Sequence, residues 1–224
     1  MDWSAITLSL RLATATTLVL LAIGLPLAAW LSLSNSRGRW LIDAMVALPL
    51  VLPPTVLGFY VLVALGPRSP LGRGYESIVG SPLVFSFEGL LVASVLYSLP
   101  FAVQPFAAAF AAVDRSLIEA AWCLGASPAR TISKVVIPLS RPGIVAGAVL
   151  AFAHTIGEFG VVLMVGGNLP GRTRTVSVSI YDDVQAFDYA RAGRTAALLL
   201  IFSFVVLATT YRQQRRAGRA WPVT

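Results

Sequence analysis

A carboxylate and an imidazole lie one helical turn apart in an otherwise apolar stretch of this sequence. Glu158 follows His154, the one histidine of the chain, by four residues, so on a helix both would share a face. An ionisable group in such surroundings is costly to bury and usually faces water or the interior of a helix bundle. Glu158 could set a gate by bonding across helices, or it could be a neutral structural strut. His154 could partner Glu158, although a lone histidine is more often a packed polar residue.

Further polar side chains interrupt the apolar stretches and could line the same path. Thr155 adjoins His154, and Ser98, Gln104 and Thr55 come from two other stretches. Enzymatic chemistry at membrane depth would need a paired nucleophile and base, or a metal cluster. One histidine, one cysteine and one deep carboxylate do not supply such a pair. We therefore expect no catalytic residue and no metal site, and interpret these side chains as candidates for a translocation path or gate.

The elements that carry these side chains are apolar enough to cross a membrane. Of the 224 residues, 57% are hydrophobic and only 12% are charged, roughly half the charged fraction of a soluble domain. Runs of about 20 apolar residues cross a hydrocarbon core as helices. We expect five transmembrane helices, at 6–33, 41–65, 87–113, 142–166 and 196–211. The fold class is thus all-α integral membrane, with residues 1–224 forming a single transmembrane domain.

The second expected span contains three prolines, Pro49, Pro53 and Pro54. Prolines remove backbone hydrogen bonds and kink helices, and in lipid the freed carbonyls need partners in protein or in a cavity. This span is therefore not expected to face lipid all round. Its bend is either a plain structural kink or part of the lining of a path.

The distribution of basic residues predicts how the spans are oriented. An odd number of spans places the two termini on opposite sides. Segments 34–40, 114–141 and 212–219 share one side and hold ten basic residues, against seven on the other side. The positive-inside rule then places the N-terminus outside and the C-terminus in the cytoplasm. Topology and anionic lipid headgroups account for the net charge of +7, so no nucleic-acid partner is expected. Of the outer segments, 66–86 is expected to be a loop, and 167–193 to include a short surface helix.

The inner segment 114–141 is far longer than a tight connector. Good helix formers precede Gly125, which can end that helix in the left-handed conformation. Ser127 can cap a second helix that begins with Pro128. Two short helices that meet at a glycine outside the membrane suit docking into a groove on a cytoplasmic partner.

The spacing within this segment resembles the coupling loop of importer permeases of the ATP-binding-cassette (ABC) class. Glu-Ala-Ala at 119–121 is followed four residues later by Gly125 and then by an apolar stretch that ends at Pro138. Positions 135 and 137 hold valine and isoleucine, where the family usually has isoleucine and leucine. The resemblance implies that the loop inserts a helix into a cleft on an ATPase. The residues that it implicates in coupling are Glu119, Ala120, Ala121, Gly125, Ser127, Pro128 and Pro138.

A second resemblance concerns the cargo. Residues 152–173, including Gly-Gly-Asn at 166–168, are similar to molybdate permeases, and Tyr-Ser-Leu-Pro-Phe at 97–101 extends the likeness over nearly the whole chain. The resemblance implies a type I importer permease that carries molybdate and, by the same route, tungstate. Sulfate and thiosulfate permeases have a similar Gly-Glu-Phe/Tyr-Gly element, so a sulfate/thiosulfate importer is the alternative.

The resemblance also implies partners and a location. It implies a homodimer with ten spans in the bacterial inner membrane, two ATPase subunits on the cytoplasmic side, and an extracytoplasmic oxyanion-binding protein docked on 66–86 and 167–193. Residues 166–173 nearly spell a phosphate-binding loop, but arginine replaces its lysine and a helix precedes it. We therefore expect no cofactor in this chain, with ATP bound by the partner subunit. A secondary transporter is disfavoured because no convincing internal repeat is present.

Overall fold

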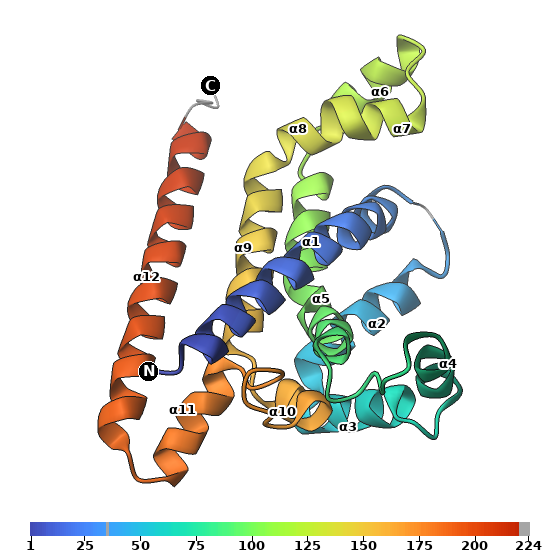
Figure 1. The fold of residues 1–224 in the computed structure, drawn as a ribbon. Coiled ribbons are helices and arrows are strands. Elements are labelled where there is room, and N and C mark those ends of the chain that lie inside the picture. Colours follow the sequence, from blue (N-terminus) through green and yellow to red (C-terminus); the bar gives the residue numbers. More distant parts are fainter. Residues whose placement is uncertain (35, 220–224) are drawn as a thin grey trace.

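The computed structural model describes residues 1–34 and 36–219, and over these residues the chain is helical without strands. Figure 1 shows the arrangement of the helices. In chain order they are α1 (Trp3–Leu33), α2 (Arg39–Val51), α3 (Pro54–Leu65), α4 (Pro70–Val79), α5 (Phe87–Ala111), α6 (Arg115–Cys123), α7 (Pro128–Thr131), a π-helical turn η1 (Ile132–Val136), α8 (Ile137–Leu139), α9 (Arg141–Gly157), α10 (Gly160–Gly166), α11 (Val176–Gln185) and α12 (Tyr189–Arg219).

The described residues contain three single helices that are long and apolar enough to cross a membrane: α1, α5 and the Tyr189–Thr210 part of α12. Two bent helix pairs have the same character. The chain bends by 113° between α2 and α3, and by 77° between Pro128–Leu139 and α9. The number of spans reaches five if each bent pair counts as one. The expected all-α membrane fold is therefore confirmed.

The centre of the molecule is the packing of α1, α5 and α9 (Figure 1). Phe106 of α5 is fully buried there, among apolar residues of all three helices. Small residues let α9 approach α5 closely: a Cβ atom added at Gly147 would lie 2.6 Å from the Phe106 ring, and one added at Gly143 would overlap the side chain of Ala109. This core holds the polar residues of α5 and α9 at fixed positions.

Two of the expected continuous spans are broken. Residues 41–65 divide at Pro53, which lacks an N–H donor and biases the residue before it towards extended backbone; Leu52 has a ψ of 134°. Residues 142–166 divide at Glu158, which is extended with a ψ of 131° between α9 and α10. Both breaks lie where the chain changes direction, so each creates a corner within the bundle.

The outer segments contain more helix than expected. Residues 66–86 were expected to be a loop, but they contain α4, which Ser69 caps by accepting a hydrogen bond from the Gly72 amide at 2.8 Å. Gly80 ends this helix with a φ of 76°. The short helix expected within 167–193 is α11. α12 begins at Tyr189 instead of 196, because Asp188 caps its first turn through the Arg191 amide at 3.0 Å.

The two ends of the molecule carry different segments. In Figure 1, α6–α8 and the C-terminal end of α12 lie at one end, whereas α3, α4, α10 and α11 lie at the opposite end. Segment 114–141 and the C-terminal end of α12 thus lie at the same end of the molecule, and the assignment of 34–40, 114–141 and 212–219 to the cytoplasmic side stays a prediction. The side chains of Arg215, Arg216 and Arg219, which entered the count of basic residues, lie outside the described part.

Candidate functional site

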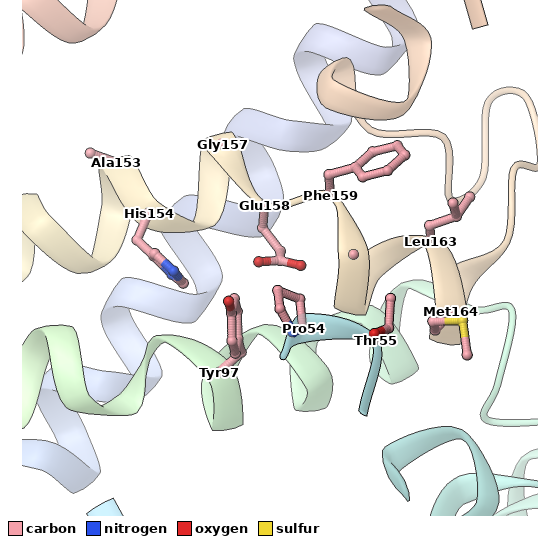
Figure 2. Close-up of a pocket in the computed structure, with 11 residues that line it drawn as sticks. Pro54, Thr55, Tyr97, Ala153, His154, Gly157, Glu158, Phe159, Leu163 and Met164 are labelled. Carbon is pink, nitrogen blue, oxygen red and sulfur yellow. The ribbon is translucent and has the colours of Figure 1, made fainter. Parts of the chain in front are cut away.

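The broken helices line an open cavity of about 590 Å³. It lies where the corner between α2 and α3 meets α5 and the break between α9 and α10, as Figure 2 shows. Its wall is mostly apolar, with four polar side chains. The lining residues are Pro54, Thr55, Tyr97, Ala153, His154, Gly157, Glu158, Phe159, Gly160, Leu163 and Met164.

Glu158 occupies the break between α9 and α10. Its side chain is buried, at 6% exposure, and its Oε1 accepts a hydrogen bond of 2.6 Å from the Val161 amide in the first turn of α10. Carboxylates in this position satisfy amides that a helix start would otherwise leave without partners. Glu158 therefore closes the end of α10, and part of its hydrogen-bonding capacity is committed to the backbone.

Close contacts with glycine hold α10 against α3. A Cβ atom added at Gly160 would lie 2.7 Å from the Cβ of Pro54, and one added at Gly58 would lie 2.9 Å from the Cβ of Met164. These distances are too short for any larger residue without movement of the helices. Contacts between a glycine of one short helix and a side chain of the other therefore fix this wall of the cavity.

His154 forms its polar contact with α5 instead of with Glu158. Its Nδ1 lies 3.0 Å from the hydroxyl oxygen of Ser98. The ring stacks on Phe101, with centroids 3.8 Å apart and an interplanar angle of 21°, and it lies 4.9 Å from the ring of Tyr97. Packing between α5 and α9 therefore orients this imidazole.

Two of the other candidates lie behind His154. Ser98 and Thr155 are buried, at 1% and 2% exposure, and their hydroxyl oxygens are 3.0 Å apart. The Thr155 hydroxyl donates to the carbonyl oxygen of Ala151 at 2.8 Å. These two residues support the cavity wall but do not form it.

The remaining two candidates, Thr55 and Gln104, line different cavities. Thr55 lines the cavity together with Glu158 and His154. Gln104 instead faces a different cavity, of about 420 Å³, that Asp43 also lines between α2 and α5. The structure thus brings three of the six path candidates to one cavity. Sequence reasoning missed Tyr97 as a lining residue, although the Tyr-Ser-Leu-Pro-Phe stretch that was singled out contains it.

The segment between α5 and α9 forms the expected glycine corner. Gly125 has a φ of 77°, and the amides of Gly125 and Ala126 donate to the carbonyls of Trp122 and Ala121 at 2.9 and 3.0 Å. This is the pattern by which glycine ends a helix. The next helix begins at Pro128 and is capped by Ser127, whose hydroxyl accepts from the Arg130 amide at 3.4 Å.

One side of the same segment is buried against the core, and the other side is exposed. Ile118 and Val136 are buried in the core that α1 and α5 form. Leu117 and Leu124 are exposed, the latter at 89%. Glu119 is exposed too and lies 3.4 Å from Arg115 in an ion pair open to solvent, an arrangement that contributes little to stability. The segment thus presents apolar and acidic groups outward from a rigid base. Of the other residues implicated there, Ala120 is exposed, and Ala121 and Pro138 are partly buried.

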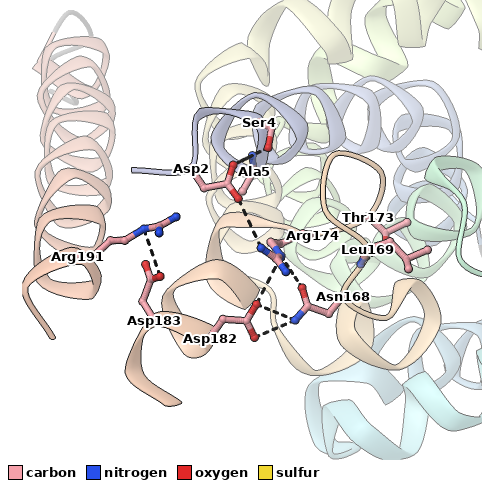
Figure 3. Close-up of polar contacts among 10 residues, drawn as sticks. All are labelled: Asp2, Ser4, Ala5, Asn168, Leu169, Thr173, Arg174, Asp182, Asp183 and Arg191. Atoms are coloured by element: carbon pink, nitrogen blue, oxygen red, sulfur yellow. Dashed lines mark hydrogen bonds and ion pairs between the residues drawn. The ribbon is translucent and has the colours of Figure 1, made fainter. Parts of the chain in front are cut away.

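At the opposite end, a polar cluster ties the N-terminus to the segment after α10 (Figure 3). The Arg174 Nε donates to Asn168 at 2.6 Å and lies 3.5 Å from Asp182, while another of its nitrogens lies 3.9 Å from Asp2. Asn168 belongs to the Gly-Gly-Asn stretch and donates to Asp182 at 2.7 Å. A hydrogen bond from the Ser4 hydroxyl, with a smaller contribution from the Arg174 charge, lowers the pKa of Asp2 below its ordinary value of 3.8.

Comparisons with known proteins place this architecture. The family model described as binding-protein-dependent transport system inner membrane component matches residues 21–217. The molybdenum transport system permease protein ModB of Azotobacter vinelandii is 52% identical over 218 residues, which cover 97% of this chain and 96% of that protein.

Two solved structures share the fold. The methionine ABC transporter MetNI, in inward-facing conformations, has a TM-score of 0.74 at 19% identity, covering 95% of this chain and 94% of that one. A bacterial alginate ABC transporter, in complex with an alginate pentasaccharide-bound periplasmic protein, has a TM-score of 0.76 at 18% identity. The match covers 96% of this chain and 78% of that one. The helical architecture described above is therefore that of ABC importer permeases.

Proposed function

The chain belongs to the family of binding-protein-dependent transport system inner membrane components, and from this premise we propose that it is the permease subunit of an ATP-driven molybdate importer that also carries tungstate. The observation that carries the cargo assignment is the 52% identity, over nearly the full length, to a molybdenum transport system permease protein. The chain itself is a multi-pass protein of the inner membrane.

We assign the translocation path to the cavity beside Glu158 and His154. Its wall is mostly apolar, and the described lining residues include no lysine or arginine. Such a wall holds an anion weakly, which suits passage because a strong site at this depth would slow release. Tight recognition then belongs to a separate binding protein. The carboxylate of Glu158 is directed to the Val161 amide, which reduces its repulsion of a passing anion.

We assign coupling to α6–α8. The exposed Glu119 and Leu124 project from a base that is buried in the core, so a force applied to them reaches the rest of the bundle. Two ATPase subunits, which bind the ATP, dock on this end of a homodimer. In this arrangement the C-terminus is cytoplasmic and the N-terminus outside.

The binding protein docks at the opposite end, on α4 and α11. The family description names a binding protein, and the alginate transporter is described in complex with a periplasmic one. ATP binding closes the ATPase pair, the coupling segments carry that motion, and the path opens outward to accept cargo. Hydrolysis resets the path inward.

The proposal is tested by uptake of radiolabelled molybdate into vesicles that hold this chain with its ATPase and binding protein. We expect ATP-dependent uptake that resists excess sulfate and is reduced by tungstate. Vesicles without ATP, or without the binding protein, are the controls. Uptake of sulfate alone, or molybdate uptake abolished by sulfate, would keep the importer and overturn its cargo. Uptake that needs no ATP would overturn the importer itself.

A further inference from the structure

Two buried hydroxyl groups stand between the backbone of α9 and the imidazole that faces the cavity. We propose that Ser98 and Thr155 fix His154 as the tautomer with its hydrogen on Nδ1, so that Nε2 faces the path as a hydrogen-bond acceptor and the cargo anion passes this wall through its hydration water. The second half of this inference rests on the proposed function, whereas the tautomer does not.

The direction of each hydrogen bond follows from counting hydrogens. Thr155 has one hydroxyl hydrogen, and the Ala151 carbonyl at 2.8 Å can only accept, so that hydrogen is committed there. Towards Ser98, 3.0 Å away, Thr155 must therefore accept and Ser98 must donate. The single hydrogen of Ser98 is then committed too. In its contact of 3.0 Å with His154, Ser98 must accept, and Nδ1 of the ring must carry the hydrogen.

The surroundings of the ring favour its neutral form. His154 packs against the rings of Phe101 and Tyr97 on α5. The ionisable groups that share its cavity are Tyr97 and Glu158, and Glu158 is hydrogen-bonded to the Val161 amide. Charging an imidazole among apolar groups without a bonded carboxylate is costly. A neutral imidazole has one donor and one acceptor nitrogen, so Nε2 is the acceptor.

The acceptor is directed at the path. Nε2 is the ring nitrogen farther from Ser98, and Figure 2 shows the ring of His154 pointing from α9 into the space between Glu158 and Tyr97. A dianion has only acceptor atoms and cannot bond to an acceptor. Water can donate to Nε2 and to the anion at once. At roughly 30 Å³ for each water molecule, the cavity of about 590 Å³ has room for an ion with water around it.

The test uses the fact that the chain contains one histidine. The full chain is labelled with ¹³C,¹⁵N-histidine, reconstituted in lipid with unlabelled partner subunits, and measured by solid-state NMR. Couplings to the ring carbons assign the two nitrogen resonances. We expect a protonated Nδ1 and an unprotonated Nε2, with Nε2 in contact with water both before and after molybdate is added.

Two variants and a control sharpen the experiment. Thr155→Val removes the acceptor for the Ser98 hydrogen, so that hydrogen can turn to Nδ1 and the ring hydrogen moves to Nε2. Ser98→Ala removes the partner of Nδ1, so both tautomers become populated. Thr17→Val is the matched control, because the Thr17 hydroxyl also donates to a carbonyl one turn back, that of Ala13 at 2.7 Å, but on α1. It leaves both resonances unchanged.

A protonated Nε2 in the native chain would overturn the tautomer, and a Thr155→Val chain with the native pattern would overturn the role of Thr155 in fixing it. Loss of the contact between water and Nε2 when molybdate is added would overturn hydrated passage. These readouts require no transport. A failure of molybdate uptake with the expected ¹⁵N pattern would therefore count against the proposed function and leave the tautomer standing.

Discussion

At the scale of single residues, Glu158 has a backbone partner that accounts for its burial. The side chain accepts from the Val161 amide at 2.6 Å, and Val161 itself is fully buried. A buried amide without a partner costs about 1–3 kcal/mol. We therefore expect position 158 to require an oxygen that accepts this hydrogen bond, more than it requires a negative charge.

Glu158→Gln keeps a carbonyl oxygen in place, and we expect it to retain both stability and ATP-dependent uptake. Glu158→Ala leaves the Val161 amide unpaired, and we expect it to lose about 1–2 kcal/mol of stability. Thermal unfolding in detergent and vesicle uptake measure the two effects. Glu88→Gln, the same change at an exposed position in the first turn of α5, is the control. A Glu158→Gln protein that assembles normally but does not transport would show that the charge itself acts in gating.

The lowered pKa of Asp2 predicts a contribution to stability that is lost in acid. Its pKa is lowered, chiefly by the hydrogen bond from Ser4 and in smaller part by Arg174. A carboxylate with a lowered folded-state pKa stabilises the fold above its unfolded value of 3.8, and the contribution disappears as the pH falls through the folded-state value. We expect Asp2→Asn to remove a few tenths of a kcal/mol at neutral pH and to flatten the loss of stability as the pH falls below about 5.

Thermal unfolding as a function of pH measures this effect. Ser4→Ala removes the largest cause of the shift and is expected to flatten the same part of the curve. Glu76→Gln, an exposed carboxyl of α4, serves as the control. Parallel curves for the native and Asp2→Asn proteins over the acid range would contradict the assignment.

At the scale of elements, the corner between α6 and α7 depends on one backbone conformation. Gly125 has a φ of 77° with open space around it. We expect Gly125→Ala to cost about 1–2 kcal/mol through conformational strain alone and to reduce uptake by displacing α7 relative to α6. Gly74 also has open space but lies inside α4 without a positive φ. Gly74→Ala should stabilise that helix by about 0.5–1 kcal/mol. Equal unfolding temperatures for the two variants would contradict this account.

The elements that sequence predicted well are those whose signals are local. Gly125, Ser127 and Pro128 act within a few residues of one another, and the corner that they form was predicted. The signals that bound α4, Ser69 with Pro70 and then Gly80, were present too, but a composition rich in glycine and proline obscured them. They could have identified the helix.

Contacts between distant elements could not be predicted in this way. Ser98 and His154 are 56 positions apart, and their contact results from the packing of α9 on α5. An apolar run indicates a span but not the residue at which the span breaks. Proline marks the break at Pro53, whereas the break at Glu158 contains no proline and is stabilised by a side-chain-to-backbone bond. The i, i+4 spacing suggested a partner for His154 that tertiary packing replaced.

At the scale of the whole molecule, the proposed path and the proposed coupling surface lie apart and communicate through α9. Figure 1 places α6–α8 at one end and α10 beyond the other end of α9. α9 begins beside α8 and ends at Glu158, in the wall of the cavity. We therefore expect a displacement of the proposed coupling segment to reach the break between α9 and α10.

Glu119→Ala should separate folding from transport. The ion pair with Arg115 is exposed, so we expect the free energy of unfolding to change by less than about 0.5 kcal/mol. Loss of a charged contact with the ATPase should weaken docking about tenfold or more. Uptake and co-purification of the ATPase are the measurements. Glu88→Ala, at an exposed position in the first turn of α5 and outside both proposed docking surfaces, controls for the loss of an exposed carboxylate. Full uptake by the Glu119→Ala protein would show that this side chain does not anchor the loop.

The chain has one cysteine, and it lies at the end of α6 with its side chain exposed. Cys123 therefore offers a natural attachment point for a fluorophore or spin label on the surface that we expect to meet the ATPase. No other thiol has to be removed first, and in a homodimer two such labels would form a symmetric pair. The distance between the two labels would then report the movement of α6 during the transport cycle, with no substitution in the protein.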